Sequence, residues 1–187
     1  MRISTADICD RCSDQPDAGL QVALPGLQPF GGTDHVSGPA ATLACEDDNA
    51  LLREIAGTPG LGRVLVIDGR GSTRRALLGD IQASRAMKNG WAGIIVHGYV
   101  RDRLSLAQLP FPVFALGTVP LRPLKNRTGE TGGELKFLNI TIRPGMWIYA
   151  DPDGMIVLNR AIEIPAPAAS TRDATIEMPQ DISEDQR

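Results

Sequence analysis

The stretch Val64-Leu65-Val66-Ile67-Asp68 decides the fold of this chain. It is short, apolar and rich in branched residues, and it ends at Gly69-Arg70-Gly71, so it predicts a strand that is buried on both faces. A second apolar run, Gly93 to His97, follows after a segment long enough for one helix. The order strand, helix, strand indicates a parallel crossover, and therefore an α/β fold.

The segment between the two runs, Asp80 to Asn89, is predicted to be that helix. Asp80 is a favourable N-cap residue, and Gly90 stands where helices often end in a left-handed residue. Ile81 and Met87 are expected to share its buried face. Asp80 would then stand at a helix N-terminus.

Charged residues also follow the second strand, at Arg101-Asp102. In open parallel sheets, ligands bind at the carboxyl ends of strands and at helix N-termini. Aspartate oxygens suit Mg²⁺ or Mn²⁺, and arginine grips a carboxylate or a developing enolate oxygen. Together with Asp80, these residues fit a metal-assisted reaction on a 2-oxo acid. The alternative is that Arg101-Asp102 is a solvated turn, since isolated ion pairs are common in loops.

Short motifs spread over about residues 3 to 160 carry a resemblance to a known family. They are Ser4-Thr5-Ala6-Asp7 with Asp10, Phe30-Gly31-Gly32, Glu46-Asp47-Asp48-Asn49 with Leu51-Leu52, Val64 to Gly69, Arg74-Arg75-Ala76-Leu77, and Gly98-Tyr99-Val100-Arg101-Asp102. In their order and spacing, they resemble the family of the regulator of ribonuclease activity A (RraA) and the class II 4-hydroxy-4-methyl-2-oxoglutarate and 4-carboxy-4-hydroxy-2-oxoadipate aldolases. The resemblance implies an RraA-like swivelling β/β/α sandwich, an α/β fold in a single domain.

The resemblance also implies a divalent metal cation, Mg²⁺ or Mn²⁺, as cofactor. Asp102 would contact the metal, and Asp80 would hold a metal-bound water and act in catalysis. Arg101, the second catalytic residue, would bind the keto and carboxylate oxygens of a small 2-oxo acid.

The substrate would lie against the start of the helix. Gly79 leads the turn there, and the backbone amides of Ile81 and Gln82 would receive the pyruvyl carboxylate. This agrees with the general affinity of helix N-termini for anions.

Two functions follow from the two branches of the family. The regulators typically replace the acid after the arginine, so Asp102 favours a class II pyruvate aldolase with oxaloacetate decarboxylase activity through a pyruvate enolate. Other motifs are closer to the regulators, which inhibit ribonuclease E-type RNA degradation by binding the enzyme; these are Phe30-Gly31-Gly32, Glu46 to Asn49, Gly71-Ser72 with Arg74-Arg75, and Asn89-Gly90-Trp91. The alternative is therefore a non-enzymatic ribonuclease partner.

The resemblance further implies a homotrimer, or a hexamer built from two trimers, with sites near the subunit boundaries. Asp10 aligns approximately with a carboxylate that the aldolases present across that boundary.

Composition sets limits on the class of protein. The chain has 187 residues, of which 42% are hydrophobic and 22% charged, as expected for one globular domain, here residues 1–162. Residues 163–187 read as an acidic, Pro- and Ala-containing C-terminal tail. The net charge of −3 argues against a nucleic-acid-binding face, which is usually basic.

The chain is expected to be soluble and cytoplasmic. It shows neither a signal-peptide pattern nor an apolar run of membrane-spanning length. Cys9 and Cys12 have CxxC spacing, but with Cys45 the only other cysteine, a zinc site would be hard to complete. Both are expected one turn apart on a helix of about Ala6 to Cys12, capped by Ser4 or Thr5 and partly buried, and a redox or metal role is the alternative.

The remaining segments predict further helices, strands and loops. Glu46 to Ile55 is predicted to be a helix whose acidic first turn serves capping, the alternative being a metal site. Leu20 to Gly38 and Lys125 to Glu134 are predicted to be irregular. Strands are expected at Phe111 to Leu116, at Leu135 to Ile142 and in a hairpin whose turn is Pro152-Asp153-Gly154. His97 is predicted to be a hydrogen-bonded structural residue, not a catalytic base.

Overall fold

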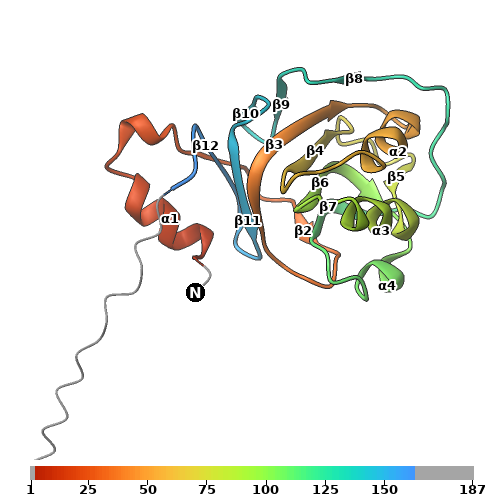
Figure 1. Cartoon of the computed structure of the whole chain (residues 1–187), viewed down its shortest axis with the longest axis horizontal. Helices are drawn as coiled ribbons and strands as arrows, with labels where there is room; N and C mark the ends of the chain where they lie inside the picture. Colours follow the sequence, from red (N-terminus) through yellow and green to blue (C-terminus); the bar gives the residue numbers. More distant parts are fainter. Residues whose placement is uncertain (1–2, 163–187) are drawn as a thin grey trace, which may run out of the picture.

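Four parallel strands form the centre of the computed structural model, which describes residues 3–162 (Figure 1). They lie in the order β3 (Val36–Ala44), β4 (Val64–Asp68), β6 (Gly93–Val100) and β7 (Val113–Thr118). Their branched and apolar residues suit a sheet that is covered on both faces. The two apolar runs, Val64 to Asp68 and Gly93 to His97, thus lie in neighbouring parallel strands, as predicted.

Further strands extend this sheet on both sides into the order β1-β12-β11-β3-β4-β6-β7-β2. The added strands are β1 (Gln21–Val22), β2 (Gln28–Pro29), β11 (Trp147–Asp151) and β12 (Gly154–Leu158), all antiparallel to their neighbours, with β5 (Ala76–Leu78) beside β6 and β8 (Glu130–Thr131) beside β3. A separate hairpin joins β9 (Leu135–Phe137) to β10 (Ile140–Ile142). The long, curved β3 joins the parallel part of the sheet to the antiparallel part (Figure 1).

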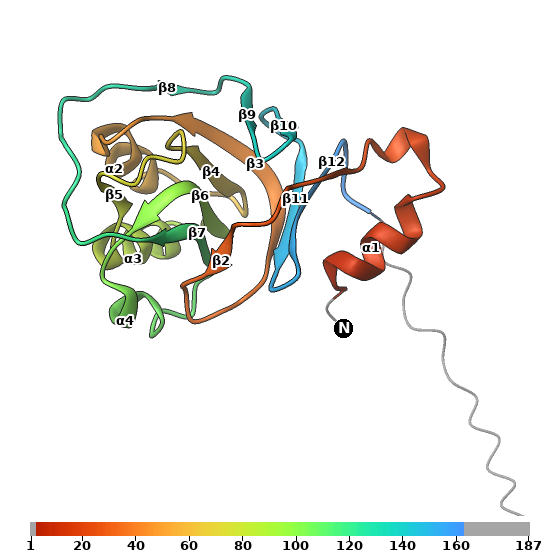
Figure 2. The same cartoon turned by 180° about the vertical axis from the view of Figure 1, so that it is seen from behind.

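Helices cover the outer surfaces. The helices α2 (Ala50–Ala56), α3 (Asp80–Lys88) and α4 (Arg103–Leu106) lie on one side of the parallel strands, whereas α1 (Thr5–Cys12) lies beyond β11 and β12 (Figure 2). The single turn η1 (Pro16–Ala18) follows α1. No helix between residues 3 and 162 combines the length and the apolar character that crossing a membrane would need.

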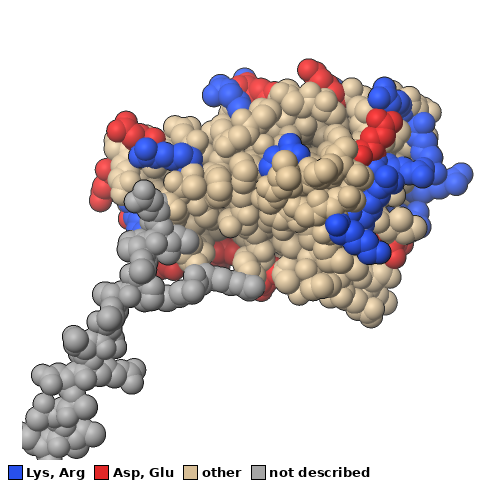
Figure 3. Space-filling view, viewed as in Figure 1, with Lys and Arg blue, Asp and Glu red and all other residues tan. Residues whose placement is uncertain are grey.

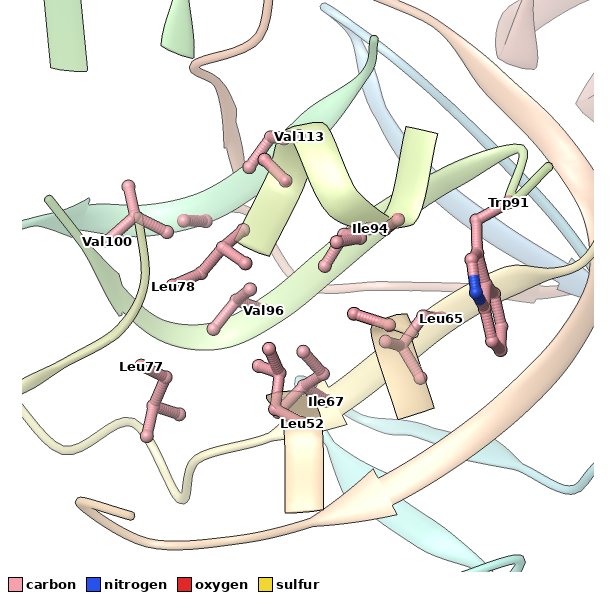
Figure 4. Close-up of a cluster of buried hydrophobic side chains, with 14 of the residues drawn as sticks. Leu52, Leu65, Ile67, Leu77, Leu78, Trp91, Ile94, Val96, Val100 and Val113 are labelled. Carbon is pink, nitrogen blue, oxygen red and sulfur yellow. The ribbon is translucent and has the colours of Figure 1, made fainter. Parts of the chain in front are cut away.

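Alternation along the strands divides the core into layers. On β4, Leu65 and Ile67 point toward the helices, into the cluster drawn in Figure 4, while Val64 and Val66 face the β9–β12 strands. On β12, Val157 continues this second cluster, whereas the neighbouring residues on the other face pack against α1. The layers therefore follow the predicted β/β/α order in one domain, with α1 as an outer addition.

Several predicted elements are confirmed. The helix α1 ends at Cys12, and Ser4 caps it in a capping box with Asp7. Along it, Cys9 is half-buried and Cys12 is buried, both as free thiols. The hairpin β11–β12 turns at Pro152 and Asp153. The tail, 163–187, lies outside the described residues.

Other predictions are wrong in extent. The helix predicted from Glu46 begins only at Ala50, because Asp47 has a left-handed backbone (φ 57°) that ends any helix there. The strand predicted over Leu135 to Ile142 is broken into β9 and β10 at Leu138 and Asn139, which both have positive φ.

The two segments that were predicted to be irregular contain short strands. Leu20 to Gly38 holds β1, β2 and the start of β3, and Lys125 to Glu134 holds β8. The strand predicted at Phe111 begins two residues later, at Val113.

Candidate active site

A cavity of about 230 Å³ lies where α3 begins. Its walls come from the start of α3, the end of β6, the start of α2 and the segment that follows β7. The lining residues are Asn49, Arg53, Leu77, Leu78, Gly79, Asp80, Ile81, Gln82, Arg101, Asp102, Arg122, Pro123 and Lys125. The structure therefore brings together all six site residues predicted from the sequence.

The start of α3 differs by one residue from the prediction. Gly79, with extended backbone, is the N-cap, and Asp80 is the first helical residue. The Asp80 carboxylate accepts a hydrogen bond of 2.7 Å from the Ile81 amide, while the Gln82 amide has no hydrogen-bond acceptor within residues 3–162. One donor of the helix N-terminus is therefore engaged by Asp80 and the next is free.

Ile81 does not belong to the buried face of α3, contrary to the prediction. Its side chain is 74% exposed and lines the cavity, whereas Ala83 and Ala86 are the fully buried residues of the helix. Small residues on the inner face let α3 pack closely on the sheet, and the isoleucine is left at the rim.

The opposite wall is the turn that follows β6. The Arg101 amide donates to the Leu78 carbonyl at 2.9 Å, which ties this turn to the segment before α3. Asp102 has a left-handed backbone (φ 60°, ψ 40°), an uncommon conformation for a residue other than glycine. Arg101 Nε lies 3.1 Å and 3.3 Å from the two carboxylate oxygens of Asp102, and both side chains remain about one third exposed.

The two walls meet at Gly79. A Cβ atom at this position would lie 2.4 Å from Asp102 Oδ2 and 3.2 Å from Arg101 Cγ. A side chain here would therefore displace the carboxylate. Gly79 is required because of this close approach and not because of its backbone angles, since its φ of −136° suits any residue.

The donors in the cavity fit a hard divalent cation. Asp102 and Asp80 supply carboxylate oxygens, and Mg²⁺ typically takes one or two protein carboxylates and completes its shell with water. Among residues 3–162, no three His, Cys, Asp or Glu side chains gather into a larger ligand set. Gln82 Oε1 is buried in this wall without a hydrogen-bond donor from the described residues, so a water or hydroxyl held in the cavity would satisfy it.

Four further polar residues of the cavity were not predicted as site residues: Asn49, Arg53, Arg122 and Lys125. Asn49 donates from Nδ2 to the Leu77 carbonyl at 3.1 Å, which holds α2 against the segment before α3. Asn49 stood in a family-like motif and Lys125 in a predicted loop, but neither position carries a local pattern that points to the cavity. They were missed because only the tertiary fold brings α2 and the segment after β7 to this place.

Two other candidates lie elsewhere. His97 Nδ1 is 2.8 Å from Asp68 Oδ1, and its ring stacks on Phe137 with centroids 4.5 Å apart, so it is hydrogen-bonded, as predicted. Asp10 is exposed on α1, which lies beyond β11 and β12 from the cavity (Figure 2).

The acidic run Glu46–Asp48 is neither a metal site nor a helical first turn. Asp47 accepts hydrogen bonds from Ser72 Oγ at 2.7 Å and Arg74 Nε at 2.6 Å, and Glu46 binds Arg74 at 2.6 Å. Burial by itself would raise the pKa of Asp47, but these hydrogen bonds and the nearby arginines outweigh it and hold the pKa below its ordinary value. Asn49 is the N-cap of α2 but forms no side-chain cap, and of the acidic run only Asp48 contacts this helix start, where it accepts a hydrogen bond of 2.9 Å from the Ala50 amide.

Comparison with known proteins finds relatives over most of the chain. Residues 5–157 match the family model described as "RraA-like: Aldolase/RraA". A protein of Laribacter hongkongensis named "Putative 4-hydroxy-4-methyl-2-oxoglutarate aldolase" is 48% identical over 156 residues, which is 83% of this chain and 96% of that protein.

Solved structures share the fold. A Geobacillus kaustophilus protein described as an S-adenosylmethionine:2-dimethylmenaquinone methyltransferase superposes with a TM-score of 0.81 at 41% identity, over 86% of this chain and 97% of that one. The RNA-processing inhibitor RraA from Thermus thermophilis superposes with a TM-score of 0.81 at 36% identity, over 87% and 96% of the two chains. The chain therefore belongs to the RraA-like (Aldolase/RraA) family.

Proposed function

We propose that this protein is a divalent-metal-dependent lyase that forms the enolate of pyruvate from small 2-oxo acids. Its reactions would be the retro-aldol cleavage of 4-hydroxy-4-methyl-2-oxoglutarate and the decarboxylation of oxaloacetate. The observation that carries this proposal is the meeting of Arg101 and Asp102 with the start of α3 in one cavity. The name of the Laribacter hongkongensis relative supports it.

Asp102 and Asp80 would hold the metal, Mg²⁺ or Mn²⁺, Asp102 directly and Asp80 through water. When bound, such a cation supplies Lewis-acid stabilisation of the developing enolate oxygen. Arg101 is already oriented by Asp102, and its planar guanidinium would bind the keto and carboxylate oxygens of the substrate.

The start of α3 would bind the substrate carboxylate. The free Gln82 amide offers one donor, and the Ile81 amide becomes a second when Asp80 turns away from it. That turn frees the Asp80 carboxylate to orient a water. In the cleavage, the C4 hydroxyl gives up its proton, the C3–C4 bond breaks, and C3 of the enolate takes up a proton, which Asp80 would move through this water.

The test is the release of pyruvate from oxaloacetate and from 4-hydroxy-4-methyl-2-oxoglutarate, with Mg²⁺ and with EDTA. We expect turnover in Mg²⁺ that EDTA removes. Asp102→Ala should lower the rate by a hundredfold or more, on the order of what one electrostatic stabiliser contributes. Asp102→Asn is the matched variant, because it keeps the side-chain shape and tolerates the left-handed backbone while removing the charge.

The controls are the metal salt alone, since oxaloacetate also decarboxylates in free solution, and the unfolding curve of each variant. If either variant of Asp102 retained full activity, the mechanism would be wrong. Wild-type rates no higher than the metal salt alone would favour the second candidate function.

The second candidate is direct inhibition of a ribonuclease E-type enzyme by binding. It is favoured by the likeness to the RNA-processing inhibitor RraA from Thermus thermophilis. It requires a stable complex with a ribonuclease E scaffold in the presence of EDTA. A pull-down that recovers no such complex would exclude it.

We also propose that the chain forms a homotrimer, alone or paired into a hexamer, with its sites near the subunit boundaries. The support is apolar exposure beside the cavity: Ile81 on α3 is 74% exposed and Leu104 on α4 is 82% exposed. Because α3 packs against α4, these two side chains lie on neighbouring helices, and apolar residues that gather on one part of a surface are typical of protein interfaces.

A further inference from the structure

Arg53, near the middle of α2, separates two adjoining hollows. It lines the 230 Å³ cavity, and it also lines a neighbouring hollow of about 480 Å³. Arg53 is exposed, and none of the ion pairs formed within residues 3–162 involves it. Its guanidinium is therefore free to bind a ligand that enters from either side.

Positive charge exceeds negative charge around this residue. The cavity is lined by four cations, Arg53, Arg101, Arg122 and Lys125, against the two carboxylates Asp80 and Asp102. Basic side chains gather on the side of the molecule that carries α2 and α3 (Figure 3, right). A metal ion would add further positive charge. A ligand with a single carboxylate would leave most of this charge without a partner.

The second hollow has one cation that is already neutralised. Arg127 pairs with Glu54 through Nε at 2.9 Å and Nη2 at 3.1 Å, which also lowers the pKa of Glu54. Arg53 and Lys125 stand where the two hollows adjoin, and neither has such a partner within residues 3–162. Arg85 also lines the second hollow, so positive charge without an ion-pair partner in the described part of the chain borders both hollows, with Arg53 between them.

We infer that Arg53 is a specificity-determining residue, which binds the carboxylate at the far end of a substrate such as 4-hydroxy-4-methyl-2-oxoglutarate and so favours 2-oxo acids whose second carboxylate the reaction leaves in place. This inference rests on the proposed function, because that function places the 2-oxo end of the substrate against α3 and Arg101. Arg101, which is held by Asp102, binds the 2-oxo end of the substrate, where the reaction takes place. Arg53 lies on α2 and determines which substrates bind.

The test measures binding and needs no turnover. Calorimetric titration in Mg²⁺ compares 2-oxoglutarate with 2-oxovalerate, acids of equal chain length of which only the first has a distal carboxylate. Wild-type protein should bind 2-oxoglutarate about tenfold or more tightly, as expected for a charge-assisted bidentate pair. Arg53→Gln should reduce that preference to about twofold or less, and Arg53→Lys should restore part of it.

Arg160→Gln is the matched control, because it removes an equal charge beyond β12, on the side of the sheet away from α2. It should keep the wild-type preference. A preference that survives Arg53→Gln, equal binding of the two acids by wild-type protein, or binding of neither would each overturn the inference. If the preference depends on Arg53 but wild-type protein releases no pyruvate, the proposed lyase is wrong and the carboxylate site stands.

Discussion

At the scale of single residues, Gly79 decides whether Asp102 can stand in the cavity. Its Cα faces Asp102 Oδ2 so closely that a methyl group would lie 2.4 Å from that oxygen. Gly79→Ala should therefore displace the carboxylate and lower metal-dependent pyruvate release by tenfold or more, with little change in the unfolding midpoint. Steady-state kinetics and urea unfolding of the same preparation check both parts.

Gly133→Ala is the control for this substitution. An added Cβ there meets only the end of Glu130, at an ordinary contact distance of 3.5 Å. It should leave both rate and stability near wild-type values. Equal activity of the Gly79 and Gly133 variants would show that the placement of Asp102 does not matter.

Asp47 gives a prediction about pH. Its pKa is held below the ordinary value of 3.8 in the folded protein by Ser72 and Arg74. The folded state therefore binds a proton less readily than the unfolded state, so the stability from this group is complete above pH 3.8 and is lost as the pH falls through the lower, folded-state pKa. Asp47→Asn should be less stable than wild type at pH 7, and the difference should shrink toward pH 3.

Urea unfolding at several pH values checks this. Asp14→Asn, at an exposed position after α1, removes the same charge away from Ser72 and Arg74 and is the matched control. A difference between wild type and Asp47→Asn that stays constant from pH 7 to pH 3 would contradict the assignment.

At the scale of elements, the helices and strands that could be predicted are those with a clear local sequence pattern. The strands β4 and β6, the helix α3 and the hairpin β11–β12 each carry an apolar run, a cap or a turn motif, and each was predicted. The central strand β3 was not predicted. Gly38 and Pro39 lie within it, and both residues are uncommon inside strands, so they interrupt the alternation of apolar and polar residues that indicates a strand. Its role is set by long-range pairing with β4 and β11, which no local pattern contains.

One carboxylate adds hydrogen bonds to the apolar packing that holds α1 against the sheet. Asp151, at the end of β11, accepts hydrogen bonds of 2.7 Å from both the amide and the hydroxyl of Thr5. Asp151→Ala should lower the free energy of unfolding by about 1–3 kcal/mol, because it leaves a partly buried donor pair without an acceptor. Urea unfolding measures this, and Asp14→Ala, exposed near the same helix, should change stability by less than about 0.5 kcal/mol.

At the scale of the whole molecule, the sequence predicted the cavity residues around the start of α3 and the end of β6, but not those from α2 or from the segment after β7. Asp80, Arg101 and Asp102 follow from where strands end and helices begin, which a sequence pattern reveals. Arg53 and Arg122 reach the cavity from segments that are distant along the chain, and only the packing of α2 and the segment after β7 places them there.

The proposed trimer gives a prediction about assembly. Light scattering should find a mass of about three, or six, times the chain mass of 20.0 kDa. Leu104→Arg, at a position 82% exposed on α4, should shift the protein toward single chains. Leu61→Arg, at a position 81% exposed before the start of β4, should not. A single-chain mass for the wild type would contradict the trimer.

The left-handed backbone of Asp102 has a consequence for how such a protein can evolve. Asparagine and glycine suit that conformation at least as well as aspartate does, and each is one nucleotide change away from an aspartate codon. A duplicated gene can therefore lose the carboxylate in a single step without backbone strain at this position. On the proposed function, a change at this one position would therefore separate the loss of lyase activity from any loss of folding.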